Sequence, residues 1–290
     1  MGAACGPEMI VDPDAVRAAV LAARDQGRRV GFVPTMGALH AGHVSLVDRA
    51  AAECDDVVVS IFVNPTQFAP QEDFTRYPRT PDADRTALAG CRVRWLFAPR
   101  ADDIYPPGWC TRISMDGPAS RFEGEHRPGH FSGVATVVCR LFMAVPADRA
   151  YFGAKDWQQT LVVRRMIRDL GVPIGIVVCP TVREPDGLAM SSRNVYLAPA
   201  DRRRATALWE ALGIAARSWD AGHVPGAIER SMRGHLESRG IAVDYAAIVD
   251  AESLGPVEPA APAVALVAGR VGGTRLIDNL QLPARSMRNE

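Results

Sequence analysis

The sequence predicts an α/β protein with a doubly wound parallel sheet, followed by a smaller C-terminal α+β domain. Over residues 1–183, short apolar runs typical of buried strands alternate with segments whose apolar residues recur at helical spacing. Such alternation favours a parallel sheet with helices on both faces. After residue 183 a long helical region precedes two strand-like runs. We therefore expect one domain over residues 1–183 and another over 184–290.

The elements of the first domain follow from these patterns along the chain. Residues 14–26 carry apolar side chains at helical spacing and end at Gly27, which is typical of a helix terminus. GVATVVCRLFMAV fits either a helix or a strand, and its length favours a helix. The other predicted elements are the strand RRVGFVPT, the loop MGALHAGH, the helix VSLVDRAAAEC, the strand DDVVVSIFVN, the turn NPTQF, the helix TPDADRTALAGC, the strands VRWLFAP and DRAYFG, the helix KDWQQTLVVRRMIRDLG and the strand VPIGIVVCPT.

The second domain is predicted to combine helices with strands. REPDGLAMSSRN is interpreted as a polar loop, and residues 201–239 as helical apart from a break at GHVPG. IAVDYAAIVD and AVALVAGRVGGTRLIDN are predicted strands on either side of a Pro- and Ala-rich connection over residues 255–263.

The composition argues against several classes of function. The 290 residues carry 33 basic and 33 acidic side chains, so no general field would attract nucleic acid or a membrane surface. Apolar runs such as VVVSIFV are far too short to span a bilayer. Any anion-binding site must therefore be local.

The N-terminus and the cysteines favour a cytoplasmic protein. MGAACGPEMIVDPD has no basic segment leading into a long apolar one, so we expect no signal peptide. MGAACG loosely resembles an acylation start but lacks the Ser or Thr at position six. The six cysteines are widely spaced without a C-x-x-C pair, which argues against a zinc site and a disulfide framework.

Polar motifs follow four of the predicted strands, namely GFVPT, VSIFV, AYFG and VVCPT. In open α/β sheets, ligands bind beyond the carboxyl ends of the strands. The motif after AYFG contains Lys155, the only lysine among the 33 basic residues. In a chain that otherwise uses arginine throughout, this lysine marks a position with a special requirement.

The segment HAGH begins a predicted helix directly after a strand. His40 and His43 are three residues apart, so both imidazoles can point at one ligand. A helix N-terminus offers unpaired N–H groups that suit a phosphate, and Gly37 and Gly42 let a nucleotide approach the backbone. Two surface histidines are the plainer alternative, and zinc is less favoured because no third ligand is evident nearby.

TMGALHAGH resembles the H-x-G-H signature of the nucleotidylyltransferase and class I aminoacyl-tRNA synthetase superfamily, and the predicted sheet is then Rossmann-like. In that superfamily a second loop, rich in Lys and Ser, closes over the triphosphate. GLAMSSRN at 187–194 resembles that loop.

H-x-G-H alone is a weak signal. However, the ordered motifs PTMGALHAGH, SIFVNPTQF, YPRT, HFSGVATVV, YFGAKDWQQ, VREPDGLAMSSRN and RVGGTRLIDN, over residues 34–279, together resemble the pantothenate synthetase (pantoate–β-alanine ligase) family.

The resemblance implies an ATP-dependent ligase with two half-reactions. The carboxylate of pantoate attacks the α-phosphate of ATP, giving pantoyl adenylate and pyrophosphate. The amine of β-alanine then attacks the acyl adenylate, giving pantothenate and AMP. The site must exclude water, because the adenylate hydrolyses readily. Mg²⁺ would bridge the phosphates, with most of its ligands from water and ATP. The resemblance also implies a homodimer.

Individual residues receive roles from the same resemblance. His43, His40 and Lys155 would be catalytic, with His43 as the acid or donor. ATP would be bound by these three and by Met36, Gly37, Ala38, Leu39, Ala41, Gly42, Gly153, Ala154, Asp156, Val182, Met190, Ser191, Ser192 and Arg193. Pantoate and β-alanine would be bound by Gln67, Gln159, Asn64, Tyr77 and Arg127, with His130 in a matching motif. Asp84, with Asp82, is the candidate metal ligand in the acidic turn after YPRT.

Several of these residues also have ordinary structural interpretations. Asp156 and Gln159 are spaced like a helix capping box. Arg127 is close in sequence to the glutamates of EGEH and could form only a surface ion pair, which contributes little to stability. Met36 and Met190 belong to a residue type that more often packs than binds ligands.

Two positions depart from the family pattern, and two other functions compete with the ligase. Ala41 and Ala154 stand where the family usually carries glutamate. A simple nucleotidylyltransferase is one competitor, but Gln67 and Gln159 argue against it because a phosphorylated substrate would call for more cations. The other is a nucleotide-binding protein without catalysis, which the missing glutamates allow and the retained histidines, lysine and MSSRN loop oppose.

Overall fold

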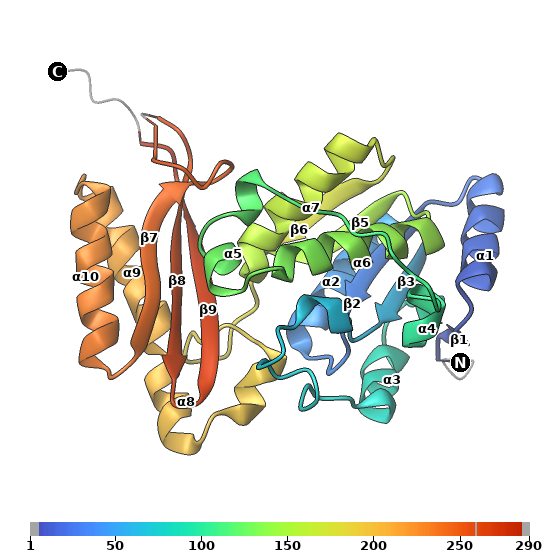
Figure 1. Ribbon diagram of the computed structural model, residues 1–290, viewed down its shortest axis with the longest axis horizontal. Helices are drawn as coiled ribbons and strands as arrows, with labels where there is room; N and C mark the ends of the chain where they lie inside the picture. Colours follow the sequence, from blue (N-terminus) through green and yellow to red (C-terminus); the bar gives the residue numbers. More distant parts are fainter. Residues whose placement is uncertain (1–5, 259, 286–290) are drawn as a thin grey trace. The chain divides into compact units, whose positions relative to one another are not determined.

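A computed structural model describes residues 6–258 and 260–285, and its contacts divide the chain into two compact units (Figure 1). The first unit comprises Met1–Ala154 and Gln158–Pro180, and the second comprises Lys155–Trp157 and Thr181–Glu290. Most of the MGAACG segment lies outside the described residues. The first unit contains a parallel sheet and the second an antiparallel one, so the predicted fold class is confirmed.

Six parallel strands form the sheet of the first unit, in the order β1-β4-β3-β2-β5-β6. Their bounds are β1 Glu8–Ile10, β2 Val30–Thr35, β3 Asp56–Ile61, β4 Trp95–Phe97, β5 Arg149–Gly153 and β6 Gly175–Cys179. From β2 the chain adds β3 and β4 on one side, and it then returns to place β5 on the other side of β2. Such a reversal of strand order is where open α/β sheets bind ligands, beyond the carboxyl ends of the two strands.

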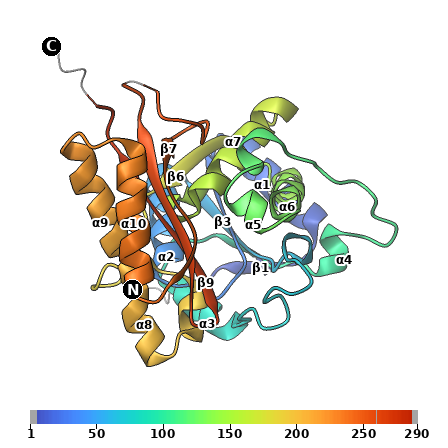
Figure 2. The same cartoon turned by 60° about the vertical axis from the view of Figure 1, so that its left-hand side comes forward.

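Helices cover both faces of this sheet (Figures 1 and 2). Helices α1, α6 and α7 share a core with Phe32 and Val58, whereas α2 and α3 share a second core with Val33 and Val59. Successive strand residues point to opposite faces, so strands buried on both faces are apolar at nearly every position. The helix bounds are α1 Pro13–Asp25, α2 Ala41–Glu53, α3 Pro81–Ala89, α6 His130–Ala144 and α7 Trp157–Leu170.

Helix α6 is the segment whose pattern fitted both a helix and a strand. Ten of its 15 residues are buried, on more than one side of the helix, which removes the one-sided apolar stripe that identifies a surface helix. The preference for a helix, based on length, is confirmed.

The turn η1 Pro65–Gln67 falls within the predicted turn NPTQF, but the other shortest elements were not predicted. They are β1 and the single turns α4 Ala101–Ile104, η2 Gly117–Ala119, α5 Glu123–His126 and η3 Ala154–Asp156. A segment of three or four residues is too short to display a period of 2 or 3.6.

The second unit packs two long helices on one face of a three-stranded antiparallel sheet, in the order β7-β8-β9 (Figure 1). The central strand β8 is buried at every position except Arg270. The predicted break at GHVPG separates α9 from α10. The bounds are η4 Ser192–Tyr196, α8 Pro199–Ala205, α9 Ala207–Asp220, α10 Pro225–Ser238, β7 Ala242–Asp250, β8 Ala263–Val271 and β9 Thr274–Leu282.

Within the described part of the chain, no helix combines the length and the apolar character that crossing a membrane requires.

Candidate active site

Two imidazoles lie together where β2 is followed by α2. His40 is the N-cap residue of α2, and its Nδ1 accepts from the N–H of Gly42 at 3.1 Å. The Nδ1 of His43 accepts in turn from the N–H of His40 at 3.3 Å, and the ring centroids are 4.1 Å apart. This is a capping box made by histidines. Because each Nδ1 accepts, each neutral ring carries its proton on Nε2, which is then its donor nitrogen.

Backbone N–H groups at this turn are largely used by the protein. The N–H of Gly42 is capped by His40, and that of His43 donates to the carbonyl of His40 at 2.8 Å. The N–H of Gly37 donates to the Thr35 hydroxyl at 3.2 Å. The expectation that a phosphate would meet unpaired N–H groups is therefore not met at these three positions. The donors that the side chains bring to this turn are the imidazole Nε2–H groups.

A buried carboxylate holds the loop between β2 and α2. Asp84, which is 2% exposed, accepts from the N–H of Ala38 at 3.1 Å, from the N–H of Leu39 at 2.8 Å and from the Thr80 hydroxyl at 3.1 Å. Gly37 has a φ of 79°, and a Cβ there would lie 2.9 Å from Asp84 Oδ2. The loop thus needs glycine beside this carboxylate.

Asp84 is the metal ligand predicted from the sequence, and its oxygens have partners within the protein. Both of its oxygens accept hydrogen bonds from the loop or from Thr80. Residues 6–258 and 260–285 contain no group of three or more His, Cys, Asp or Glu side chains placed to hold a metal ion. Asp84 therefore holds this loop, and its role as a metal ligand stays a prediction from the sequence.

Asn64 caps the turn η1 after β3, and its amide is fully used inside the protein. Its Oδ1 accepts from the N–H and the hydroxyl of Thr66 and from the hydroxyl of Tyr105, at 2.9–3.2 Å. Its Nδ2 donates to Gln67 Oε1 at 3.0 Å and to the carbonyl of Gly133 at 3.2 Å. These contacts orient the amide of Gln67, and the substrate-binding role of Asn64 stays a prediction from the sequence.

Gln67 keeps donor capacity. Its Nε2 donates to the sulfur of Met36 at 3.0 Å, and a thioether is only a weak acceptor. The Oε1 is held by Asn64, so the NH₂ group is the part of this amide that a ligand oxygen can engage.

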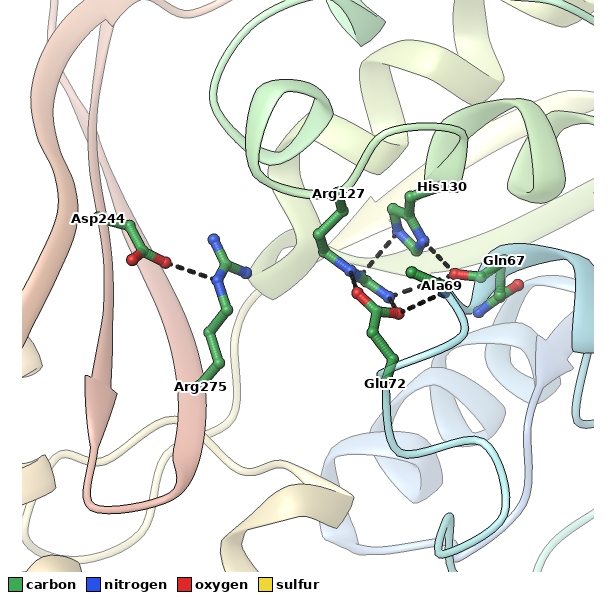
Figure 3. Close-up of polar contacts among 7 residues, drawn as sticks. All are labelled: Gln67, Ala69, Glu72, Arg127, His130, Asp244 and Arg275. Atoms are coloured by element: carbon green, nitrogen blue, oxygen red, sulfur yellow. Dashed lines mark hydrogen bonds and ion pairs between the residues drawn. The ribbon is translucent and has the colours of Figure 1, made fainter.

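A charged network holds the backbone carbonyl of Gln67 (Figure 3). His130 Nδ1 donates to this oxygen at 2.9 Å, and Arg127 Nη2 donates to it at 3.3 Å. His130 Nε2 must then accept from Arg127 Nη1, at 3.1 Å. Arg127 also makes a two-pronged ion pair with Glu72, at 2.7 and 2.8 Å. Arg127 therefore pairs with Glu72. The alternative suggested by the sequence, an ion pair with a glutamate of EGEH, is not what the structure shows.

The pKa values of this network follow from burial and from the guanidinium. Burial, followed by the charge of Arg127, lowers the pKa of His130 from 6.5 to about 4. Burial alone would raise the pKa of Glu72, but hydrogen bonds and charge from Arg127 outweigh it and the pKa is lowered. At neutral pH, Glu72 is therefore ionised and His130 is neutral.

Two adjacent glutamines near the start of α7 have different environments. Gln158 is buried, and its amide accepts from the N–H of Glu123 at 3.1 Å and donates to the carbonyls of Pro118 and Arg121 at 2.8 and 2.7 Å. Gln159 is half-buried, and within residues 6–258 and 260–285 its side chain has no hydrogen-bond partner. Gln158 thus holds a loop, whereas the amide of Gln159 remains available to a ligand.

Three further predicted positions lie in the first unit. Tyr77 is buried and packs edge-on against Phe68. Strand β5 ends at Gly153, and the next residue, Ala154, is only 6% exposed. The family's usual glutamate would need additional room at Ala154, whereas Ala41 is exposed in the first turn of α2.

The remaining predicted nucleotide-binding residues belong to the second unit. Lys155 lies in the turn η3, and its Nζ is 3.6 Å from Asp156 Oδ1. Ser191 caps the turn η4, and its hydroxyl accepts from the N–H of Arg193 at 3.2 Å. The N–H of Met190 donates to the carbonyl of Val182 at 3.0 Å.

The loop before Met190 is held by side chains that no sequence motif indicated. The guanidinium of Arg183 makes two bonds to Asp278, at 2.6 and 3.0 Å, and lies 3.8 Å from the centre of the Trp209 ring. Gly187 has a φ of 91°, and a Cβ there would lie 2.0 Å from Trp209. Elsewhere in the same unit, Arg275 of β9 pairs with Asp244 of β7 at 2.6 Å (Figure 3). Asp278 lies in the motif RVGGTRLIDN, but nothing in the sequence indicated its partner.

The family model described as pantoate-beta-alanine ligase matches residues 8–281. The chain belongs to the pantoate–β-alanine ligase family. A pantothenate synthetase of Moorella thermoacetica is 50% identical over 281 residues, which cover 95% of this chain and 98% of the relative. One from a Roseiflexus species is 53% identical over 257 residues, which cover 88% and 92%.

Solved structures of pantoate–β-alanine ligases agree with this assignment. The crystal structure of pantothenate synthetase from Thermus thermophilus has a TM-score of 0.87 and 48% identity, and the match covers 94% of this chain and 98% of that one. The ligase from Francisella tularensis, complexed with beta-gamma ATP and beta-alanine, has a TM-score of 0.80 and 34% identity, with 94% and 97% covered. The expected family and enzyme class are confirmed.

Replacing Asp84 tests whether it holds the loop. In Asp84→Asn, an NH₂ group replaces one acceptor oxygen and faces a loop N–H, so we expect a loss of about 1–3 kcal/mol in unfolding free energy and weaker ATP binding. Urea unfolding and calorimetric titration with ATP measure the two effects. Asp102→Asn, the same exchange at an exposed position of α4, is the control. Recovery of normal ATP binding at high Mg²⁺ would instead indicate a metal ligand.

The stability of the first unit should depend on pH through His130. Its pKa is about 4 in the folded protein and 6.5 ordinarily, so on acidification the unfolded chain takes up the proton first. The contribution of neutral His130 to the unfolding free energy is complete above pH 6.5 and is lost as the pH falls toward 4. Urea unfolding across this interval should show a shallower pH dependence for His130→Asn than for the wild type. The variant His126→Asn, at an exposed site, should retain the wild-type slope, and equal slopes for all three proteins would contradict the prediction.

Proposed function

We propose that the protein is an ATP-dependent ligase that joins pantoate to β-alanine through a pantoyl-adenylate intermediate and releases pyrophosphate and AMP. The pair of imidazoles at the carboxyl end of β2, where the strand order reverses, carries the proposal. Each carries an Nε2–H donor suited to an anion. Family membership over residues 8–281 and the ATP and β-alanine of the Francisella tularensis relative support it.

The adenylation step requires the carboxylate of pantoate to reach the α-phosphate without being neutralised. We assign pantoate to the amides of Gln67 and Gln159, with β-alanine also near Gln67. An amide binds hydroxyl and carboxylate oxygens but adds no positive charge, so the nucleophile keeps its reactivity. The oriented NH₂ of Gln67 and the uncommitted amide of Gln159 support this assignment. Tyr77 and Arg127, which the sequence predicts to bind substrate, also support the site through other residues. Tyr77 packs against Phe68, and Arg127 donates to the backbone carbonyl of Gln67.

Charge develops on the phosphate oxygens as the carboxylate attacks. Fixed donors aimed at that charge lower the barrier, because they need no rearrangement during the reaction. We assign His40, His43 and Lys155 to this role, with the Ser191, Ser192 and Arg193 segment. The other nucleotide contacts proposed are Met36, Gly37, Ala38, Leu39, Ala41, Gly42, Gly153, Ala154, Asp156, Val182 and Met190. Positioning and electrostatic stabilisation account for most of the catalysis in phosphoryl and nucleotidyl transfer.

Mg²⁺ is expected to enter as a complex with ATP. The described residues contain no group of three His, Cys, Asp or Glu side chains that fits a metal ion. Phosphate oxygens and water are the usual majority of ligands for Mg²⁺ at nucleotide sites. The proposed roles of the protein side chains therefore concern the phosphates and the substrates.

We further propose a cytoplasmic homodimer in which residues 1–183 bind nucleotide and pantoate and residues 184–290 act as a lid. The free thiols of Cys54, Cys91, Cys110, Cys139 and Cys179 are consistent with a reducing compartment. The dimer and the lid are expectations from the family resemblance.

One assay separates the ligase from its competitors. Purified protein is incubated with ATP, Mg²⁺ and pantoate, with and without β-alanine, and pyrophosphate and AMP are measured. The proposal requires that pyrophosphate release depends on pantoate and that stoichiometric pantothenate and AMP appear only when β-alanine is added. A nucleotidylyltransferase would form no pantothenate, and a binding protein would release no pyrophosphate.

Replacing the single lysine tests the phosphate assignment. Arginine is larger and directional, whereas a compact ammonium on a flexible stem can follow the α-phosphate as its geometry inverts. We expect Lys155→Arg to fold normally but to lose roughly a hundredfold in adenylation rate. Acyl transfer from supplied pantoyl adenylate should suffer less. Arg165→Lys, an exposed exchange of the same two residue types on α7, is the matched control. Near-normal turnover of Lys155→Arg would refute the assignment.

A further inference from the structure

The strand β9 contains two adjacent buried polar residues, Asp278 and Asn279, within the sequence LIDNLQL. They are only 3% and 6% exposed. Successive strand residues point to opposite faces, and Leu276 and Leu282, which share the face of Asp278, belong to the apolar core with α9 and α10. Asp278 therefore faces the helices, and Asn279 faces the other side of the sheet.

Each of these side chains binds a segment that carries predicted nucleotide-binding residues. On the helical face, Asp278 binds Arg183 at the base of the loop that leads to Ser191. On the opposite face, Asn279 Nδ2 donates to the backbone carbonyl of Lys155 at 2.7 Å. The two residues are themselves joined, because the N–H of Asn279 donates to Asp278 Oδ1 at 2.8 Å.

The bond from Asn279 matters because it holds the backbone of the lysine itself. Lys155 lies in a single turn, where a short 3-10 segment has weaker hydrogen-bond geometry than an α-helix. The ammonium is 3.6 Å from Asp156, an i,i+1 ion pair that is longer than a hydrogen bond. Asn279 restrains this turn at the carbonyl of Lys155, and Trp157 restrains it through Nε1, which donates to the carbonyl of Ala251 at 2.9 Å.

We propose that Asn279 is a positioning residue for the Lys155 ammonium during adenylation. The inference rests on the proposed function, since it assumes that Lys155 stabilises charge on the phosphates. A four-carbon stem reaches only as far as its backbone allows, so a shift of the turn moves the ammonium away from the phosphate oxygens. Asn279 acts through the lysine and has no contact with substrate in this proposal.

The variant Asn279→Ala removes the donor and leaves the lysine in place. We expect the adenylation rate, measured as pantoate-dependent pyrophosphate release, to fall roughly tenfold to hundredfold, because small misplacements of a catalytic group cost that much. The rate of pantothenate formation from supplied pantoyl adenylate and β-alanine should change by less than about twofold, since the lysine is assigned to the first half-reaction. Gln281→Ala is the matched control: Gln281 lies on the same face of β9 two residues away, is exposed, and should leave both rates unchanged.

A double variant separates positioning of the lysine from general damage. If Asn279 acts through Lys155, then Asn279→Ala has little further effect on adenylation once Lys155→Ala has removed the ammonium. Additive losses in the double variant would overturn the proposal. Equal losses in both half-reactions of Asn279→Ala, or a profile identical to that of Gln281→Ala, would overturn it as well.

Two controls keep the outcomes distinct. Thermal unfolding reports whether the variants are folded, and Asn279→Leu, which removes the donor but keeps a similar side-chain size, replaces Asn279→Ala in the same comparison if the latter does not fold. If the wild-type protein lacks pantoate-dependent pyrophosphate release, the proposed function itself is wrong. If the wild type is active and only the predicted pattern for Asn279 is missing, the positioning role alone is wrong.

Discussion

The reversal of strand order at β2 is the constraint on which the candidate site of the first unit depends. Because β3 and β5 flank β2 on opposite sides, the loops after these strands begin at one edge of the sheet. Those loops have little regular structure, so their backbone groups need partners elsewhere. Buried side chains supply them: Asp84 accepts from the loop after β2, and Asn64 caps the turn after β3.

The predicted site residues thus differ in what their polar atoms do. Asp84, Asn64 and Arg127 form their hydrogen bonds within the protein. Asp84 positions the backbone of the loop after β2, and Asn64 and Arg127 position Gln67. The NH₂ of Gln67 and the amide of Gln159 are less committed. A charged or fully bonded side chain inside the fold is costly to detach, since a lost partner leaves a buried group unsatisfied. Substitution of the first group should therefore affect folding and activity together, whereas substitution at Gln159 should affect activity alone.

Much of the fold could be predicted because long elements carry periodic patterns. The apolar runs of β2 and β3 and the spacing in α1 and α2 predicted the sheet and its helices, and ordered motifs predicted the family. Pairings between residues distant in sequence could not be predicted in this way. Glu72 meets Arg127 across 55 positions, and Asn279 meets Lys155 across 124, and only the tertiary fold determines such contacts. The sequence also could not show that His40 and His43 come together through a helix cap, because histidine is not among the usual capping residues.

That histidine cap restricts the chemistry open to the two rings. A neutral imidazole with Nδ1 accepting can polarise a phosphate oxygen through Nε2–H, but it cannot readily give that proton away, since an imidazolate would remain. To act as a Brønsted acid, the ring would first need a second proton on Nδ1. That proton would face the backbone N–H of Gly42 or of His40 and break the cap. The start of α2 therefore selects between two familiar roles of histidine, because it stabilises the electrostatic donor and penalises the proton donor.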